Sequence, residues 1–187
     1  MFRRILGLLR PSSNQSSIPP VQPKVLLIIH NPRVPSYGGR LHEVMRWQDP
    51  DGLVGQYIYD VAAASFGYAN YEVVERIEVD GFPVKKDGFV YDAETYVQRW
   101  TTRTGFHQPD GADYGRILHK YDVISKINSG AIDEVWLMGF PYAGYFESRM
   151  VGADAFWCNA PPLIDRQAKR RFVVMGFSYE RGAGEML

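Results

Sequence analysis

Lys24-Val25-Leu26-Leu27-Ile28-Ile29-His30-Asn31 places five consecutive aliphatic residues between a charged start and a polar end. A continuous apolar run of this length is typical of a strand that is buried on both faces. Pro32 follows directly and has no backbone N–H for a ladder, so we expect the strand to end there. The run therefore predicts a strand in a sheet whose two faces are both covered.

Three later segments have the pattern of further strands, at 71–79, 134–140 and 171–177. The first alternates apolar with charged residues and is followed by Asp80-Gly81, which is typical of a strand that ends in a turn. The other two are short apolar runs, like the run before Pro32. Each of the four strands is expected to supply polar residues at its end.

Helical spacing of apolar residues predicts three helices between these strands. They cover 54–65, 93–100 with Asp92 as its cap, and 117–127 as one continuous helix that ends at Gly130. Strands separated by helices favour a mostly parallel sheet. We therefore expect an open α/β domain of three layers, with four to five strands and helices on both faces.

The first 23 residues differ in composition from the rest of the chain. Residues 11–23 hold four prolines and four serines and no charged side chain, which is typical of a disordered linker. Residues 1–10 carry three arginines and no acid, and an apolar face made of Phe2, Ile5, Leu6 and Leu9. This basic start either contacts anionic lipid or nucleic acid or is a frayed, solvated end. We expect one α/β domain over 24–187.

Composition excludes several classes of function. The 187 residues carry 21 basic and 21 acidic side chains, so no global positive field favours a nucleic-acid partner. A single cysteine, Cys158, excludes an intramolecular disulfide and a cysteine-based zinc cluster. No apolar run reaches the roughly 18 residues of a transmembrane helix. The apolar stretch 5–9 is too short for the core of a signal peptide. We therefore expect no nucleic-acid partner and no transmembrane segment.

Ligands of open parallel sheets bind beyond the carboxyl ends of the strands, so the residues that follow each strand are the candidates. Two of these ends repeat one pattern, Met-Gly-Phe-x-Tyr, at 138–142 and 175–179, and each copy is followed by a Glu and an Arg. The repeat predicts either a shared cleft or the packing of two neighbouring strands. The candidate binding residues are Asn31, Tyr142, Tyr145, Arg149, Tyr179 and Arg181.

Three residues are candidates for catalysis. Glu147 and Glu180 could act as general acid and base if their environments separate their pKa values. The alternative is that they form ordinary ion pairs with Arg149 and Arg181. His30 follows the first strand and is a candidate base, although a lone histidine is also a common structural hydrogen-bonding residue.

Thiol and metal chemistry have weaker support. Cys158 lies beside Asn159 and could form a nucleophile with His30, or it could be a buried, inert thiol. No cofactor or metal site is predicted within this chain, because the other histidines lack the close pairing of a helical zinc motif. These histidines are His42, His107 and His119.

Three segments carry a resemblance to a known group of proteins: EVWLMGFPYAGYFESR (134–149), AFWCNAPP (155–162) and MGFSYERGAGEML (175–187). In these segments the chain resembles a group of uncharacterised bacterial proteins that are often exported and have no assigned activity. The resemblance implies an extracytoplasmic location. It also implies relatives that continue past the last segment into a helix with histidines, so that this chain is a truncated form. A divalent metal would then bind only the longer form.

Two functions from different classes remain open, together with that of a truncated, inactive remnant. The first is a hydrolase-like domain that uses Glu147 and Glu180, with His30 and Asn31 on the facing wall. The second is a non-catalytic domain whose aromatic side chains stack on a small-molecule ligand, either a sugar or a peptide. Those side chains are Tyr142, Tyr145, Phe146, Trp157 and Tyr179.

Overall fold

The computed structural model describes residues 18–186. Our expectations for residues 1–17 concern a part of the chain outside these residues. None of the helices in the described part has the length and hydrophobicity needed to cross a bilayer.

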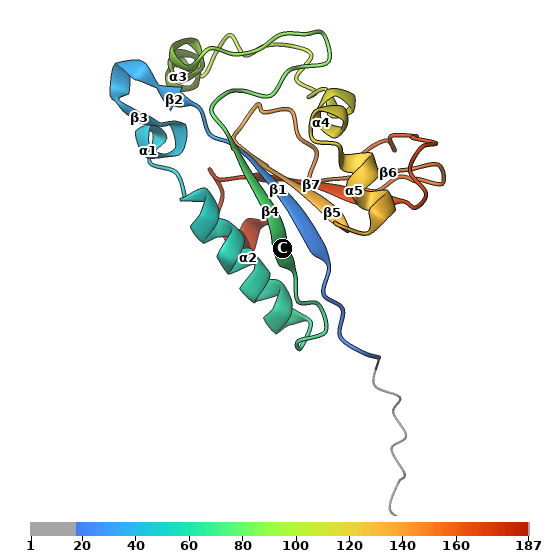
Figure 1. The fold of residues 1–187 in the computed structure, drawn as a ribbon. Helices are drawn as coiled ribbons and strands as arrows, with labels where there is room; N and C mark the ends of the chain where they lie inside the picture. The colour runs from blue at the N-terminus through green and yellow to red at the C-terminus, as the bar shows by residue number, and fades with distance from the viewer. Residues whose placement is uncertain (1–17, 187) are drawn as a thin grey trace, which may run out of the picture.

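One five-stranded sheet forms the centre of the protein, in the order β4-β1-β5-β7-β6 (Figure 1). Its strands are β1 (Lys24–His30), β4 (Glu72–Val79), β5 (Glu134–Gly139), β6 (Ser148–Val151) and β7 (Phe172–Ser178). The first four strands in the order are parallel, and β6 pairs antiparallel with β7 at one edge. A separate hairpin joins β2 (Arg33–Val34) to β3 (Gly39–Arg40). The predicted α/β fold with a mostly parallel sheet is confirmed.

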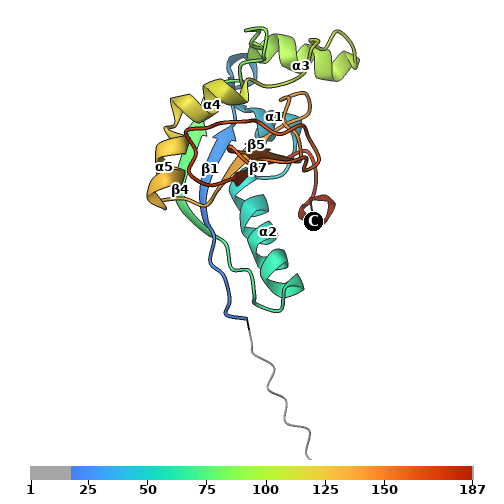
Figure 2. The ribbon, with the colours of Figure 1, turned by 90° about the vertical axis from the view of Figure 1, so that its right-hand side faces the viewer.

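Helices cover both faces of this sheet. They are α1 (Leu41–Met45), α2 (Pro50–Ala64), α3 (Ala93–Thr102), α4 (Tyr114–Lys120) and α5 (Val123–Ser129), with short 3-10 turns at Pro35–Tyr37 and Ala183–Glu185. Figure 2 shows α2 on one side of the strands and α4 and α5 on the other. Alternate residues of β1 accordingly enter two cores: Leu27 lies in the core under α2, and Leu26 in the core under α4 and α5. This explains why β1 is apolar throughout.

Local signals gave the positions of most elements. The three later strands begin and end within one residue of the expected bounds, and Asp92 caps α3 by accepting a hydrogen bond from the Thr95 N–H at 2.8 Å. The continuous helix predicted for 117–127 is wrong, because Asp122 takes a left-handed backbone conformation (φ 51°) that separates α4 from α5. Helix α2 begins four residues earlier than predicted, at Pro50, where Asp49 caps it.

The two glycines of the repeated Met-Gly-Phe pattern allow one segment to cross the sheet. A Cβ at position 176 in β7 would lie 2.3 Å from the carbonyl oxygen of Phe146 and 2.7 Å from the Cβ of Tyr145. A Cβ at position 139 in β5 would lie 2.8 Å from the ring of Tyr145. The hydroxyl of Tyr145 reaches Nδ1 of His30 in β1, at 2.7 Å. The Tyr145 side chain therefore spans three adjacent strands, and glycine is required where it passes closest.

We expect Gly176→Ala to lower the free energy of unfolding by about 2 kcal/mol or more, because the new methyl group overlaps backbone atoms that cannot move freely. Urea denaturation measures the loss. Gly55→Ala in α2 is the matched control, since nothing lies within 4 Å of its Cβ position and alanine favours a helix interior by up to about 1 kcal/mol. Equal stability of the two variants would show that the close crossing is absent.

Candidate functional site

A cavity of about 700 Å³ lies at the carboxyl edge of the sheet, beside the ends of β5 and β7. Its walls come from the C-terminal end of α3, the loop after β5, the second half of β7 and the last residues before Met186. A volume of this size suits a small ligand. Five of the nine predicted site residues line it: Tyr142, Tyr145, Glu147, Glu180 and Arg181.

The carboxylate of Glu147 is held at the rim of this cavity. Its Oε2 accepts a hydrogen bond from the amide of Asn159 at 2.7 Å, and its Oε1 lies 3.8 Å from Nη1 of Arg181. The side chains of Glu147 and Arg181 are 70% and 51% exposed, so water screens their attraction. Of the two ion pairs considered from the sequence, Glu147 forms the one with Arg181 and not the one with Arg149.

The second predicted carboxylate, that of Glu180, is exposed and has no ion-pair partner among residues 18–186. It follows β7 as Glu147 follows β5, and both side chains line the same cavity. The Glu180 carboxylate is therefore available to pair with a positively charged group of a ligand.

Aromatic side chains also line the cavity, among them Trp100 and Tyr142. Tyr142 stacks on Phe106 with ring centroids 3.6 Å apart, and Trp100 carries the guanidinium of Arg103 at 3.7 Å from its ring centre. Tyr142 itself has a left-handed backbone (φ 62°), and its ring is partly exposed. The cavity thus offers flat apolar faces and charged groups to the same occupant.

A fully buried lysine, Lys85, forms hydrogen bonds to two segments of the cavity wall. Nζ of Lys85 donates to the carbonyl oxygen of Asp110 at 2.8 Å, to the Asp110 carboxylate and to the carbonyl oxygen of Tyr142. Burial lowers the pKa of Lys85, and the adjacent carboxylate partly offsets this effect. The lysine therefore connects the loop of Asp110 to the loop of Tyr142, at the point where both line the cavity.

Four predicted site residues lie outside the cavity lining and hold the fold together. Tyr179 is buried, and its hydroxyl donates to the carbonyl oxygen of His30 at 3.1 Å. Arg149 is buried over the ring of Tyr114 and donates to the carbonyl oxygen of Pro161 at 2.9 Å. Asn31 is also buried, next to the ring of a neighbouring histidine. His30 is the fourth of these residues, and its side chain bonds to Tyr145.

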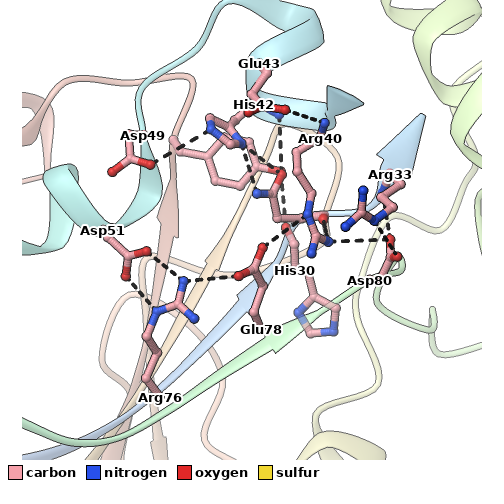
Figure 3. A network of polar contacts seen from close by, with 12 residues as sticks. His30, Arg33, Arg40, His42, Glu43, Asp49, Asp51, Arg76, Glu78 and Asp80 are labelled. Carbon is pink, nitrogen blue, oxygen red and sulfur yellow. Dashed lines mark hydrogen bonds and ion pairs between the residues drawn. The ribbon is translucent and has the colours of Figure 1, made fainter. Parts of the chain in front are cut away.

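The ends of β1 and β4 are closed by a network of polar contacts (Figure 3). Arg40 donates to the carbonyl oxygen of Asn31 at 2.8 Å and lies 3.5 Å from Glu78 and 3.6 Å from Asp80. The amide of Asn31 lies 2.9 Å from Nδ1 of His42. These contacts fasten the β2–β3 hairpin over the two strand ends. Of the four parallel strands, β5 and β7 therefore have the ends that face open space.

The Cys158, His30 and Asn159 set considered from the sequence does not assemble. The sulfur of Cys158 lies 3.1 Å from the hydroxyl of Ser148, whereas the side chain of Asn159 bonds to Glu147 and that of His30 to Tyr145. A thiol nucleophile assisted by these partners is therefore not present. Within residues 18–186, no three His, Cys, Asp or Glu side chains are placed to share a metal ion.

Sequence reasoning missed the contributions of α3 and of the loop around Asp110 to the cavity. Trp100 and Arg103 end a helix, and Lys85 and Asp110 lie in loops, where charged residues are ordinarily solvated. No pattern in the sequence distinguishes them from surface residues.

No protein-family model, curated protein or solved structure matches the chain.

Burial and the nearby charge of Lys120 lower the pKa of His30 to about 4 from an ordinary value of 6.5. The folded protein therefore binds fewer protons than the unfolded chain between these values. Stabilisation from the neutral ring is complete above pH 6.5 and is lost as the pH falls toward 4, by about 3 kcal/mol.

We expect His30→Gln to remove this part of the acid sensitivity. Unfolding free energies measured at pH 7 and pH 4 should differ less in the variant than in the unaltered protein. His119→Gln is the control, because that histidine is exposed on α4. An unchanged pH dependence in His30→Gln would mean that the ring is already solvated in the folded state.

Proposed function

We propose that the cavity at the ends of β5 and β7 binds a small polar ligand, either a sugar or a short peptide, that carries an amino group. The observation that carries this proposal is the composition of the cavity wall. The exposed carboxylate of Glu180 and the ring face of Tyr142 line one space of about 700 Å³.

The charges of the wall favour a cationic ligand group. Four carboxylates line the cavity against two guanidinium groups. Lys85 compensates the carboxylate of Asp110, and Arg181 lies beside Glu147. A surplus of negative charge remains, and an ammonium group on the ligand would balance it. The face of Tyr142 adds an apolar contact suited to a sugar ring or a peptide side chain.

Exposure of the two glutamates favours binding over catalysis. A carboxyl group that acts as a general acid near neutral pH needs an environment that holds its proton, such as an apolar pocket. Glu147 is 70% exposed, next to Arg181, and Glu180 is also exposed. Both positions suit a carboxylate that attracts a ligand through its charge.

We expect Tyr142→Ala to weaken ligand binding about fivefold, because a stacked aromatic face contributes about 1 kcal/mol. Glu180→Gln should weaken binding of glucosamine and lysine dipeptides more than binding of glucose and alanine dipeptides. Isothermal titration with these four probes measures both effects. Tyr59→Ala on α2 is the control, since Tyr59 is an exposed tyrosine outside the cavity. If none of the probes binds, or if Tyr59→Ala matches Tyr142→Ala, this proposal fails.

Hydrolysis is the second candidate function. It is favoured by one observation: Glu147 and Glu180 follow neighbouring strands and line the same cavity. In that case one carboxyl group would protonate the leaving group, and the other would activate water. His30 lies outside the cavity lining and would act only through Tyr145.

We expect Glu147→Gln and Glu180→Gln each to lower turnover of a hydrolysed glycoside or peptide by about 10²-fold or more if this second function holds. A screen of chromogenic glycosides and peptides provides the substrate. Glu72→Gln is the control, because Glu72 is exposed at the start of β4. Turnover that is unchanged in both cavity variants would remove the two glutamates from the chemistry.

A further inference from the structure

Exposed apolar side chains gather at the edge of the sheet opposite the cavity. Phe66 is 98% exposed and Ile18 is 72% exposed, and Tyr68 is exposed beside them. Backbone hydrogen bonds hold these segments together, because Val21 donates to the carbonyl oxygen of Tyr68 at 2.7 Å and accepts from Asn70 at 2.9 Å. Figure 1 shows this end of the molecule, where the chain enters and where α2 is followed by β4. We call it the amino edge, since β1, β4, β5 and β7 begin there.

The turn that contains Phe66 leaves the ring of this residue exposed to solvent. Phe66 has a left-handed backbone (φ 53°), and the turn is closed by hydrogen bonds from Phe66 to Ala63 at 3.1 Å and from Gly67 to Ala62 at 2.7 Å. Asparagine or glycine suits this conformation better than phenylalanine. Because the ring of Phe66 is almost fully exposed, it contributes little to the stability of the folded domain. The apolar surface of the ring is therefore available to a partner.

Positive charge lies along the same edge. Lys169, Arg170 and Arg171 form a basic run immediately before β7, and all three are exposed. Arg170 is paired with Asp133 at 2.7 Å, whereas Lys169 and Arg171 have no carboxylate partner within residues 18–186. The guanidinium of Arg171 lies 5.3 Å from the centre of the exposed Phe156 ring.

A groove of about 480 Å³ connects the basic run to the entering chain. Val21 and Pro23 line one part of it, and Arg170 and Arg171 line another. Cationic groups beside apolar surface match an interface in which anionic headgroups lie above hydrocarbon. Two carboxylates also line the groove: Asp133 is paired with Arg170, and Glu134 accepts hydrogen bonds from Tyr71 and Trp136. Glu72 and Asp154 are exposed near this edge and balance Lys169 and Arg171 in number.

The sequence before Ile18 is basic and partly apolar. Residues 1–17 contain three arginines and no acidic residue, and five of residues 1–10 are leucine, isoleucine or phenylalanine. Ile18 is the first described residue, and Val21, three residues later, bonds to Tyr68. Weak membrane anchors become effective when two of them act together.

We propose that the amino edge docks onto an anionic lipid surface, with Phe66 and Tyr68 at the interface and the basic residues facing the headgroups. The cavity lies at the other ends of β5 and β7, so docking in this orientation leaves it open to solvent. The proposal is independent of the ligand proposed for the cavity.

Co-sedimentation with phosphatidylcholine vesicles, with and without phosphatidylglycerol, tests the proposal on the full chain. We expect binding to the anionic vesicles only, and weaker binding at raised salt. Phe66→Ser should lower the partition coefficient about tenfold, because an interfacial aromatic ring is lost. The double variant Lys169→Glu/Arg171→Glu should lower it by a similar factor. Tyr37→Ser is the control, since Tyr37 is exposed on the hairpin that covers the strand ends.

Three results would overturn the proposal. The first is equal binding to neutral and anionic vesicles, and the second is unchanged binding of both amino-edge variants. The third is a dimer in lipid-free sedimentation that Phe66→Ser dissociates, because the occupant of the edge would then be a second copy of the chain. Circular dichroism of each variant confirms folding, and the charge variant tests the same face if Phe66→Ser does not fold.

Discussion

The side chain of Tyr145 crosses β7, β5 and β1 in turn, and the position of the loop after β5 depends on this contact. Two glycines, Gly176 and Gly139, leave space for this side chain. Its hydroxyl lies 2.7 Å from Nδ1 of His30. Burial raises the pKa of Tyr145 and lowers that of His30, so a neutral phenol meets a neutral imidazole at pH 7. The loop is thereby fixed against the sheet, and the next residues can return as β6.

The carboxyl edge of the sheet is divided into a closed part and an open part. Over β1 and β4, the β2–β3 hairpin is fastened by Arg40 and its partners. Beside β5 and β7, the buried Lys85 connects the loop of Asp110 to the loop of Tyr142. The open part is the cavity, and its wall combines ring faces with exposed carboxylates. This division explains why residues that follow β1 are structural and residues that follow β5 and β7 face a ligand-sized space.

The opposite edge has a different chemical character. It combines the exposed ring of Phe66 with a basic run before β7. In a parallel sheet these two edges face in opposite directions, since all parallel strands begin at one and end at the other. A surface contact at the amino edge and a ligand at the carboxyl edge can therefore coexist without steric conflict.

The sequence by itself determined the four parallel strands, the Asp92 cap and the α/β class, because apolar runs, alternation and capping act over a few neighbouring residues. It also pointed to Glu147 and Glu180, since loops after strands lie at one edge. It did not indicate the edge strand β6 or the β2–β3 hairpin. Only the tertiary structure decided that both line one cavity while Arg149 and Tyr179 turn inward. Strand order and the crossing of Tyr145 depend on contacts between residues far apart in the sequence, such as Val25 with Glu134 and His30 with Tyr145. Such contacts leave no periodic pattern in the sequence.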